Sequence, residues 1–290
     1  MSFADSLRAT QELATLPHVA TRVLAMLEND ELDLREITNA IESDAPLTLK
    51  IIRVANSPVF AVRSSVTSVH QAILTLGLNR VTNIVLGVSV FTKFMMLANK
   101  RSPQLMQKFW LHSASTGMVA KALARKLKKN FKELEFLGGL LHDVGKMTMI
   151  QYNADMYDKV GMLVESGDKR DREAEREIFG IDHCEAGAII ASMWKLPQEL
   201  QMVIAKHHEP EQLEQGRELI SLIRVADILC EIWGVGAGEG IEKVRLADEQ
   251  SWQILCSLNP GLDSLDLEAF TFELEQELSN ASNFMESAGS

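Results

Sequence analysis

Cysteine, aromatic residues and long apolar runs are all scarce in this sequence of 290 residues. The three cysteines, Cys184, Cys230 and Cys256, are too few for a disulfide framework. Their odd number indicates free thiols in a reducing compartment. Aromatic residues make up 6% of the chain, so a core must consist mainly of Leu, Val, Ile, Ala and Met.

No apolar stretch is long enough to cross a bilayer. The most apolar segment, residues 84–94, is shorter than the roughly 20 residues that a membrane helix needs, and it contains Lys93. The N-terminus carries charges and has no apolar h-region, so we expect no signal peptide. These features predict a cytoplasmic protein that makes no membrane contact.

A surplus of basic residues is also missing, because the net charge is −11. Residues 1–100 are neutral overall, residues 101–240 carry −3, and residues 241–290 carry −8, from ten acidic and two basic side chains. Such a balance disfavours nucleic-acid binding, which depends on neutralising phosphates. One basic cluster exists, and we interpret it as a solvated helix end rather than a binding patch: Arg125, Lys126, Lys128, Lys129 and Lys132.

The apolar residues recur at helical spacing, and no sustained alternation of period two is present. The sequence therefore predicts an all-α fold. We expect an N-terminal helical lobe over residues 1–100, packed against a second, metal-binding lobe over residues 101–240. An acidic helical extension over residues 241–290 follows.

Five predicted helices carry the histidines and acids of interest, over residues 104–129, 132–141, 183–194, 198–208 and 219–233. In the first, His112 belongs to an apolar stripe at steps of three and four, which places it on the inward face. In the third, Asp182 with Glu185 is a capping-box pattern, so the helix begins at His183.

The remaining segments have simpler expectations. The charge-rich residues 151–180 predict a surface helix, and residues 234–240 predict a flexible loop. The acidic extension predicts helices over 247–257 and 265–279 and fraying after Asn280.

Helices and helix ends thus present seven candidate metal ligands: His112, His142, Asp143, His183, His207, His208 and Asp227. Neutral imidazole with ionised carboxylate suits divalent ions such as Fe, Mn, Ni, Co or Zn. Seven ligands exceed the needs of one tetrahedral site, so we expect two ions, with Asp143 as the natural bridge. Two such ions can bind a phosphate and activate a water. Lys146 lies one short turn further on, so Asp143 and Lys146 are the candidate catalytic residues.

Each candidate also has a plainer interpretation. His142 and Asp143 can form a buried hydrogen-bonded pair without metal, and His112 can be a satisfied core histidine. His183 can be a surface residue of a first turn. Residues 207 and 208 point about 100° apart on a helix, so both bind only at a helix end or to different ions.

The same alternatives apply to the acidic and basic candidates. Asp227 lies on an otherwise apolar helix, where it must be a ligand or a paired acid. Lys146 can be a solvated lysine, and Cys184 is better explained as a packed residue than as a ligand.

Several stretches of the sequence resemble one family. The runs LPHVATRVLAMLEND, IESDAPLTLKIIRVANSPVF and VTSVHQAILTLGLNRVTNIVLGVSV, followed by GGLLHDVGK, DHCEAGAIIASMWKLP and AKHHEP, look like the HDOD family, the HD-related output domains of bacterial signalling. The likeness covers roughly residues 12–230, and its N-terminal block is the distinctive part. It implies signalling through contacts with a protein partner. We expect no attached receiver or cyclase domain, so control would come from a separate chain.

The wider HD superfamily implies a ligand set of His112, His142, Asp143 and Asp227. The HD-GYP cyclic-dinucleotide phosphodiesterases add histidines that match His183, His207 and His208, and a lysine that matches Lys146. The HD-GYP signature itself is absent, because PEQLEQ follows Glu209. Lys108 also replaces the glutamate of a third metal site. These departures put cyclic di-GMP hydrolysis in doubt more than they affect a pair of metals.

Two functions remain open from the sequence. The first is an HDOD signalling protein that holds metals and acts through protein contacts. The second is a metal-dependent phosphohydrolase or phosphodiesterase acting on a nucleotide, with Asp143 bridging the ions and an activated water as nucleophile.

Overall fold

The computed structural model describes residues 2–9, 16–27, 33–60, 62, 64–98, 103–167, 169–236 and 244–289. Every regular element in these ranges is an α-helix or a short 3-10 helix, which confirms the all-α prediction. None of the helices described is long and apolar enough to span a bilayer.

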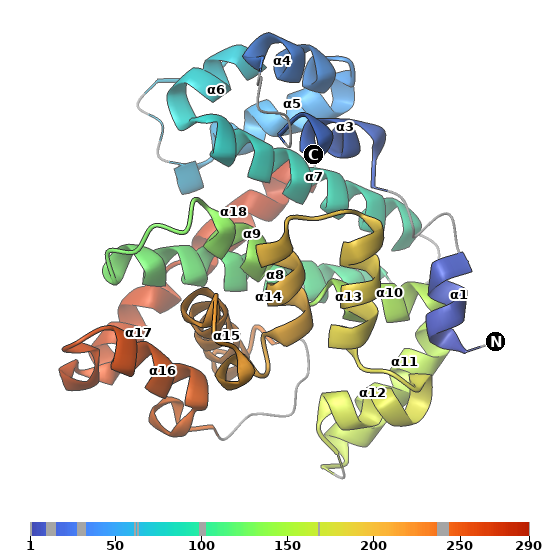
Figure 1. The fold of residues 1–290 in the computed structure, drawn as a ribbon, viewed down its shortest axis with the longest axis vertical. Helices are drawn as coiled ribbons and strands as arrows, with labels where there is room; N and C mark the ends of the chain where they lie inside the picture. The colour runs from blue at the N-terminus through green and yellow to red at the C-terminus, as the bar shows by residue number, and fades with distance from the viewer. Residues whose placement is uncertain are drawn as a thin grey trace.

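The N-terminal part forms a group of helices at the top of Figure 1: α3 (His18–Leu27), α4 (Leu34–Glu42), α5 (Ala45–Ala55), α6 (Val69–Leu76) and α7 (Leu78–Ala98). Local signals set their ends. Asp33 caps α4 by accepting a hydrogen bond from the Arg35 amide. Gly77, with a φ of 87°, ends α6 in a conformation that side chains disfavour.

The following helices surround a long central one, α8 (Pro103–Lys126), which packs against α9 and α15. In chain order they are α9 (Leu134–Leu141), α10 (Val144–Tyr152), α11 (Ala154–Glu165), α12 (Asp171–Phe179), α13 (His183–Met193), α14 (Gln198–Lys206) and α15 (Arg217–Ile232). The first helix, α1 (Phe3–Ala9), packs against α13, far from its sequence neighbours, and Phe3 lies against the rings of Tyr152 and Phe179.

The prediction of one surface helix over residues 151–180 is wrong. This segment forms two helices, α11 and α12, that pack on each other, and α12 turns one face inward. Asp171 and Glu175 are buried on that face. The many charges of this segment therefore do not predict that two of its acids are buried in the interior.

The acidic extension forms α16 (Gln250–Leu258), α17 (Leu267–Glu275) and α18 (Leu278–Gly289). The expected fraying after Asn280 is wrong, because α18 continues to Gly289 and packs against both α8 and α5 (Figure 1). Its Phe284 is fully buried, with its ring 5.4 Å from that of Phe136. The C-terminal helix is thus part of the core.

Acids meet several members of the basic cluster at the end of α8. Arg125 lies 3.0 Å from Glu277, Lys126 pairs with Glu273, and Lys129 lies 2.6 Å from Glu218 on α15. The Arg125 side chain is 72% exposed, so its pair adds at most about 1 kcal/mol of stability. The pairs of Arg125 and Lys126 thus join the end of α8 to the acidic extension.

Two hydrophobic cores run through the described residues. One extends from α1 and the N-terminal helices through α9, α10 and α13 to α18, and the other lies between α8, α15, α16 and α17. The division at residues 100 and 240 stays a prediction.

Candidate metal centre

The structure brings all seven predicted ligands to one place. His112 comes from α8, His142 and Asp143 from the turn between α9 and α10, and His183 from the first turn of α13. His207 and His208 directly follow α14, and Asp227 lies in α15. Six of these side chains have no exposed surface, and His208 alone among the seven is partly exposed.

Close helix packing at two glycines of the GGLLHDVGK segment makes this convergence possible. A Cβ on Gly139 would come within 2.7 Å of the Gly117 backbone, so α9 reaches α8 only without a side chain there. A Cβ on Gly145 would come within 1.9 Å of the His183 carbonyl oxygen. These contacts place the His142–Asp143 turn against His112 on one side and His183 on the other.

Three ligands form the first half of the site. The His112 Nε2 atom lies 3.1 Å from Asp227 Oδ1 and 3.4 Å from His142 Nε2. The distance from His142 Nε2 to Asp227 Oδ1 is 3.6 Å. The carboxylate of Asp227 also pairs with Arg224 one turn earlier in α15, so Asp227 is both near the histidines and a paired acid.

Three histidines form the second half. The Nε2 atom of His183 lies 3.3 Å from that of His207 and 3.0 Å from that of His208. Because α14 ends at Lys206, residues 207 and 208 lie beyond the helix, and both rings turn toward His183. The expectation that His183 could be a surface residue is wrong.

Asp143 lies between the halves. Its Oδ2 atom is 3.5 Å from His142 Nε2 and 3.8 Å from His112 Nε2. Its Oδ1 atom is 3.4 Å from His183 Nε2 and 3.6 Å from His207 Nε2. One carboxylate therefore faces each half with a different oxygen.

The other nitrogen of each buried ring faces a fixed acceptor. His112 Nδ1 lies 3.0 Å from the Val235 carbonyl oxygen, and His142 Nδ1 lies 2.7 Å from that of Gly139. His207 Nδ1 lies 3.2 Å from the Val203 carbonyl, and His183 Nδ1 lies 2.7 Å from Glu175 Oε2. A neutral ring that donates through Nδ1 presents an Nε2 lone pair, so each of these four rings points a lone pair into the site whenever it is neutral.

This arrangement fits cations. Nitrogen and oxygen ligands about 2.1 Å from one ion lie roughly 3.0 to 3.4 Å apart in octahedral or tetrahedral geometry, close to the spacings of 3.0 to 3.8 Å given above. Among the described residues, both Asp143 oxygens and Asp227 Oδ1 are buried without a well-formed hydrogen bond. Lys146 and Arg224 offset part of the charge of these two carboxylates. The oxygens that lack a hydrogen bond are unfavourable in a dry interior, and a cation in each half would bind them.

The pKa values of the candidate ligands also indicate that the site favours positive charge. Burial disfavours the charged form of His142, but Asp143 and Asp227 outweigh burial and raise its pKa to about 9. Burial lowers the pKa of His207 to about 4. Burial alone would raise the pKa of Asp143, yet Lys146 and His142 hold that pKa well below its usual range. Against the effect of burial, Arg224 and His142 likewise lower the pKa of Asp227. Both carboxylates thus favour positive charge on the groups beside them, and the pKa of His112 is also raised.

Lys146 is fully buried, so the interpretation as a solvated lysine is wrong. Its Nζ atom lies 3.0 Å from Asp143 Oδ2 and 3.1 Å from Asp171 Oδ2. Cys184 is a packed residue with its sulfur 3.9 Å from His207 Nδ1, and burial raises the pKa of its thiol.

Sequence reasoning missed Asp171 and Glu175, which support the ligands from behind. Glu175 Oε2 accepts from both the amide and the ring of His183, and burial raises the Glu175 pKa to about 8. A usable signal existed, because both acids share one helical stripe with Ala174 and Ile178.

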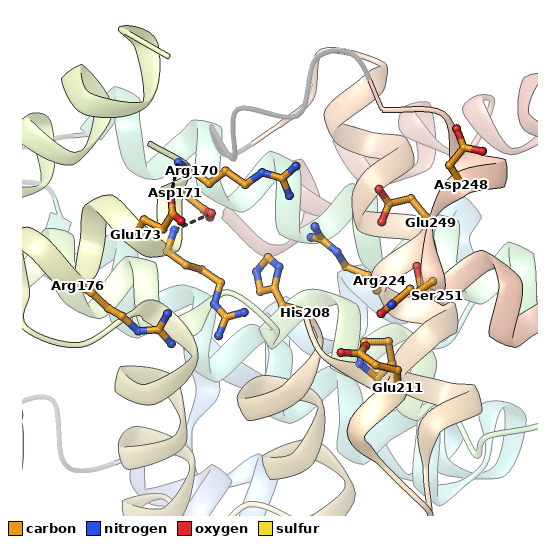
Figure 2. Close-up of a pocket in the computed structure, with 13 residues that line it drawn as sticks. Arg170, Asp171, Glu173, Arg176, His208, Glu211, Arg224, Asp248, Glu249 and Ser251 are labelled. Carbon is orange, nitrogen blue, oxygen red and sulfur yellow. Dashed lines mark hydrogen bonds between the residues drawn. The ribbon is translucent and has the colours of Figure 1, made fainter. Parts of the chain in front are cut away.

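A pocket of about 480 Å³ opens beside the second half (Figure 2). His208 lines it together with Asp171, Arg172 and Arg224. Arg172 is held by Asp182 at 2.8 Å and by Glu209 at 2.9 Å. The pocket therefore meets the candidate metal ligands at His208.

A model of the HDOD domain family matches residues 13–210, more than half of the chain. The match includes the ligands from His112 to His208 and ends before Asp227. A curated relative, an uncharacterised protein of Treponema pallidum, is 22% identical over 229 residues. That alignment covers 78% of this chain and 43% of the relative, so the chain spans less than half of the relative's length.

Solved structures show the same fold. An HDOD domain protein with unknown function from Geobacter sulfurreducens is 22% identical, with a TM-score of 0.80 over 98% of this chain and 97% of that one. A "putative phosphohydrolase" from Shewanella amazonensis is 20% identical, with a TM-score of 0.69 over 94% of each chain. A "putative signal transduction protein" from Marinobacter aquaeolei is 22% identical, with a TM-score of 0.68 over 94% of this chain and 58% of that one. The predicted resemblance is confirmed, while the likeness to the HD-GYP ligand set stays a prediction.

Proposed function

The chain belongs to the HDOD domain family, and from this premise we propose that it is a cytoplasmic signal-transduction output protein holding two divalent transition metals. In this proposal the protein passes its signal through contacts with a protein partner. The convergence of imidazole Nε2 atoms on the two oxygens of Asp143 carries the metal part of the proposal. The name of the Marinobacter structure supports a place in signal transduction.

The residues divide between the two ions. His112, His142 and Asp227 would hold one, and His183, His207 and His208 would hold the other, with Asp143 contributing one oxygen to each. Imidazole and carboxylate suit Fe, Mn, Ni, Co or Zn. The positive charge of Lys146 beside Asp143 Oδ2 offsets part of the negative charge that Asp143, Asp171 and Asp227 concentrate there.

A second candidate is a metal-dependent phosphohydrolase acting on a nucleotide or another phosphoester. The observation that favours it is the pocket that meets the ligand set at His208. Two bound metals would supply a Lewis acid and an activated water. In this candidate Asp143 would help to hold both ions, while His208 and Arg224 line the pocket in which a phosphoester would bind. The names of two Shewanella structures are consistent with such chemistry.

Elemental analysis of protein purified without a histidine tag tests the metal centre. We expect about two transition-metal ions per chain, and protein without metal after growth in supplemented medium would contradict the proposal. The Asp143→Asn variant keeps the size of the side chain and removes its charge. It should retain helical circular dichroism and lose metal.

Turnover separates the two candidates. The metal-loaded protein is offered a panel of phosphodiesters and phosphomonoesters in the presence of Mn or Fe. An output protein leaves the panel intact. Hydrolysis that disappears in Asp143→Asn, with the fold retained, would replace the output proposal by the phosphohydrolase.

A further inference from the structure

The pocket beside the metal ligands has two walls of different origin. Residues 170–173 and Arg176 line one wall, within the segment that the family model matches. The opposite wall consists of Glu211, Arg224 and residues 248–251, all of which follow the matched segment. The acidic extension of this chain thus helps to form the entrance to its candidate metal centre.

The two walls also differ in charge. On the first, Asp182 and Glu209 neutralise Arg172, and Asp182 also holds Arg176 at 2.6 Å. Arg170 on the same wall is exposed, and its guanidinium forms no ion pair with any described residue. Figure 2 shows this guanidinium extending across the pocket toward the wall that contains Arg224 and Glu249. The ring of His208 lies close by in the same view.

The opposite wall presents carboxylates. Glu211 and Glu249 line it, and neither forms an ion pair within the described part of the chain. In Figure 2 the Glu249 carboxylate faces the pocket near Arg224, whose own charge is committed to Asp227. Asp248 also lines the pocket, but its carboxylate lies 3.7 Å from Arg245.

We propose that this pocket binds a phosphate ester whose other end donates N–H hydrogen bonds. Arg170 binds the phosphoryl oxygens beside His208, because a guanidinium matches their geometry and charge. Glu211 and Glu249 accept hydrogen bonds from the donor end. An ester without donors leaves these carboxylates facing an anion alone, so the wall selects against it. The volume of about 480 Å³ lies within the range of small-molecule sites.

This inference rests on the proposed metal centre and names the ligand class of the same site. It concerns binding alone, so it holds for either an output protein that senses the ligand or an enzyme that acts on it. The N–H donor can be an aliphatic ammonium or the amino group of a base, and the probes below distinguish the two.

Calorimetric titration of the full, metal-loaded chain with two matched pairs of probes tests the proposal. The first pair is 2-aminoethyl phosphate and ethyl phosphate, and the second is guanosine and inosine 5′-monophosphate. Within each pair the two probes differ in one nitrogen donor group. We expect the donor-bearing member of at least one pair to bind about tenfold more tightly, as a charge-assisted hydrogen bond allows. The pair that shows the preference identifies the donor.

Three variants test which wall of the pocket binds the phosphate and which binds the N–H donor. The double variant Glu211→Gln and Glu249→Gln should lose the preference while binding ethyl phosphate at least as well as the wild type. Arg170→Gln should weaken all four probes about tenfold. The control Asp248→Asn should change neither. Because none of these residues belongs to the ligand set, each variant should keep the wild-type metal content and unfolding temperature.

The outcomes separate this inference from the metal centre. Equal binding within both pairs, or a preference that survives in the double variant, would overturn the ligand class and leave the metal centre standing. A chain without metal overturns the proposed function and this inference together. A chain that holds its metals but binds none of the four probes overturns the inference alone.

Discussion

The Nε2 atoms of His112 and His142 lie 3.4 Å apart, and a backbone carbonyl faces the opposite nitrogen of each ring. Two imidazole lone pairs that face each other at this distance repel unless a proton or a metal ion lies between them. The metal-free protein meets the problem with a proton on His142, whose pKa is raised to about 9. The contacts that fix the rings thus hold them ready for a cation.

Substitutions of the two aspartates should affect metal content differently. Asp143→Asn should remove most of both ions, because the two oxygens of Asp143 face separate halves. Asp227→Asn should remove one ion, because Asp227 contacts only His112 and His142 among the histidines. Metal content per folded chain is the measurement, and equal losses in both variants would argue against a bridging Asp143.

Glu175 should matter for metal affinity without being a ligand. It holds His183 through the amide and Nδ1, so its loss frees the ring. Removal of a group that orients a ligand typically lowers metal affinity about 10- to 100-fold. We expect such a loss for Glu175→Ala in a competition titration with a chromophoric chelator. Glu175→Gln keeps one acceptor oxygen and should recover part of the affinity.

Metal affinity should fall as the pH is lowered from 9. Since the pKa of His142 in the metal-free protein is about 9, His142 carries a proton at neutral pH that a metal must displace. Binding at the first half should therefore weaken up to tenfold for each pH unit between 9 and 6. His207, with a pKa of about 4, stays neutral over this range. Calorimetry in buffers of different ionisation enthalpy should show proton release, and an affinity independent of pH would contradict this account.

Two glycine substitutions should have opposite effects on stability. In Gly145→Ala the new Cβ would approach the His183 carbonyl to 1.9 Å, so α10 and α13 must separate. Overpacking of this kind typically costs about 1 to 3 kcal/mol. Gly161→Ala in α11 meets no atom within 4 Å and should stabilise the helix by up to about 1 kcal/mol. Urea denaturation of the metal-free proteins measures both changes.

Phe284→Ala should strongly destabilise the whole protein. The ring is fully buried and contacts Phe136, although the residue lies six positions before the last residue of the sequence. Truncation of a buried phenylalanine costs about 3 to 5 kcal/mol. Phe272→Ala is the matched control, because that ring is 64% exposed on α17. Similar unfolding midpoints for the two variants would show that α18 does not belong to the core.

Much of the site could be predicted because its ligands lie on strongly periodic segments. The stripe that contains His112 and the capping box of Asp182 and Glu185 both formed as expected. The contacts behind the rings could not be predicted, since Val235 supports His112 from 123 residues away. Residues 237–243, which include part of the predicted flexible loop, lie outside the described ranges.

The misses have a common physical cause. Hydropathy alone assigns Asp171 and Glu175 to the solvent, yet buried acids can face a cationic side chain such as Lys146. The acidity of the extension likewise gave no indication that α18 is packed in the core. The small apolar residues Ala281 and Ala288 of this helix are buried against other helices. In both segments tertiary contacts outweigh composition.

The ligands of the first half come from α8, the α9–α10 turn and α15, so an ion there would join positions as distant in the chain as His112 and Asp227. Such an ion would bind only the folded arrangement of these residues, so it would stabilise the folded protein against unfolding as long as metal is present. The protein saturated with metal should then unfold at a higher temperature than the same protein after chelation, because removal of the ion separates no covalent bond yet frees helices that are distant in the chain.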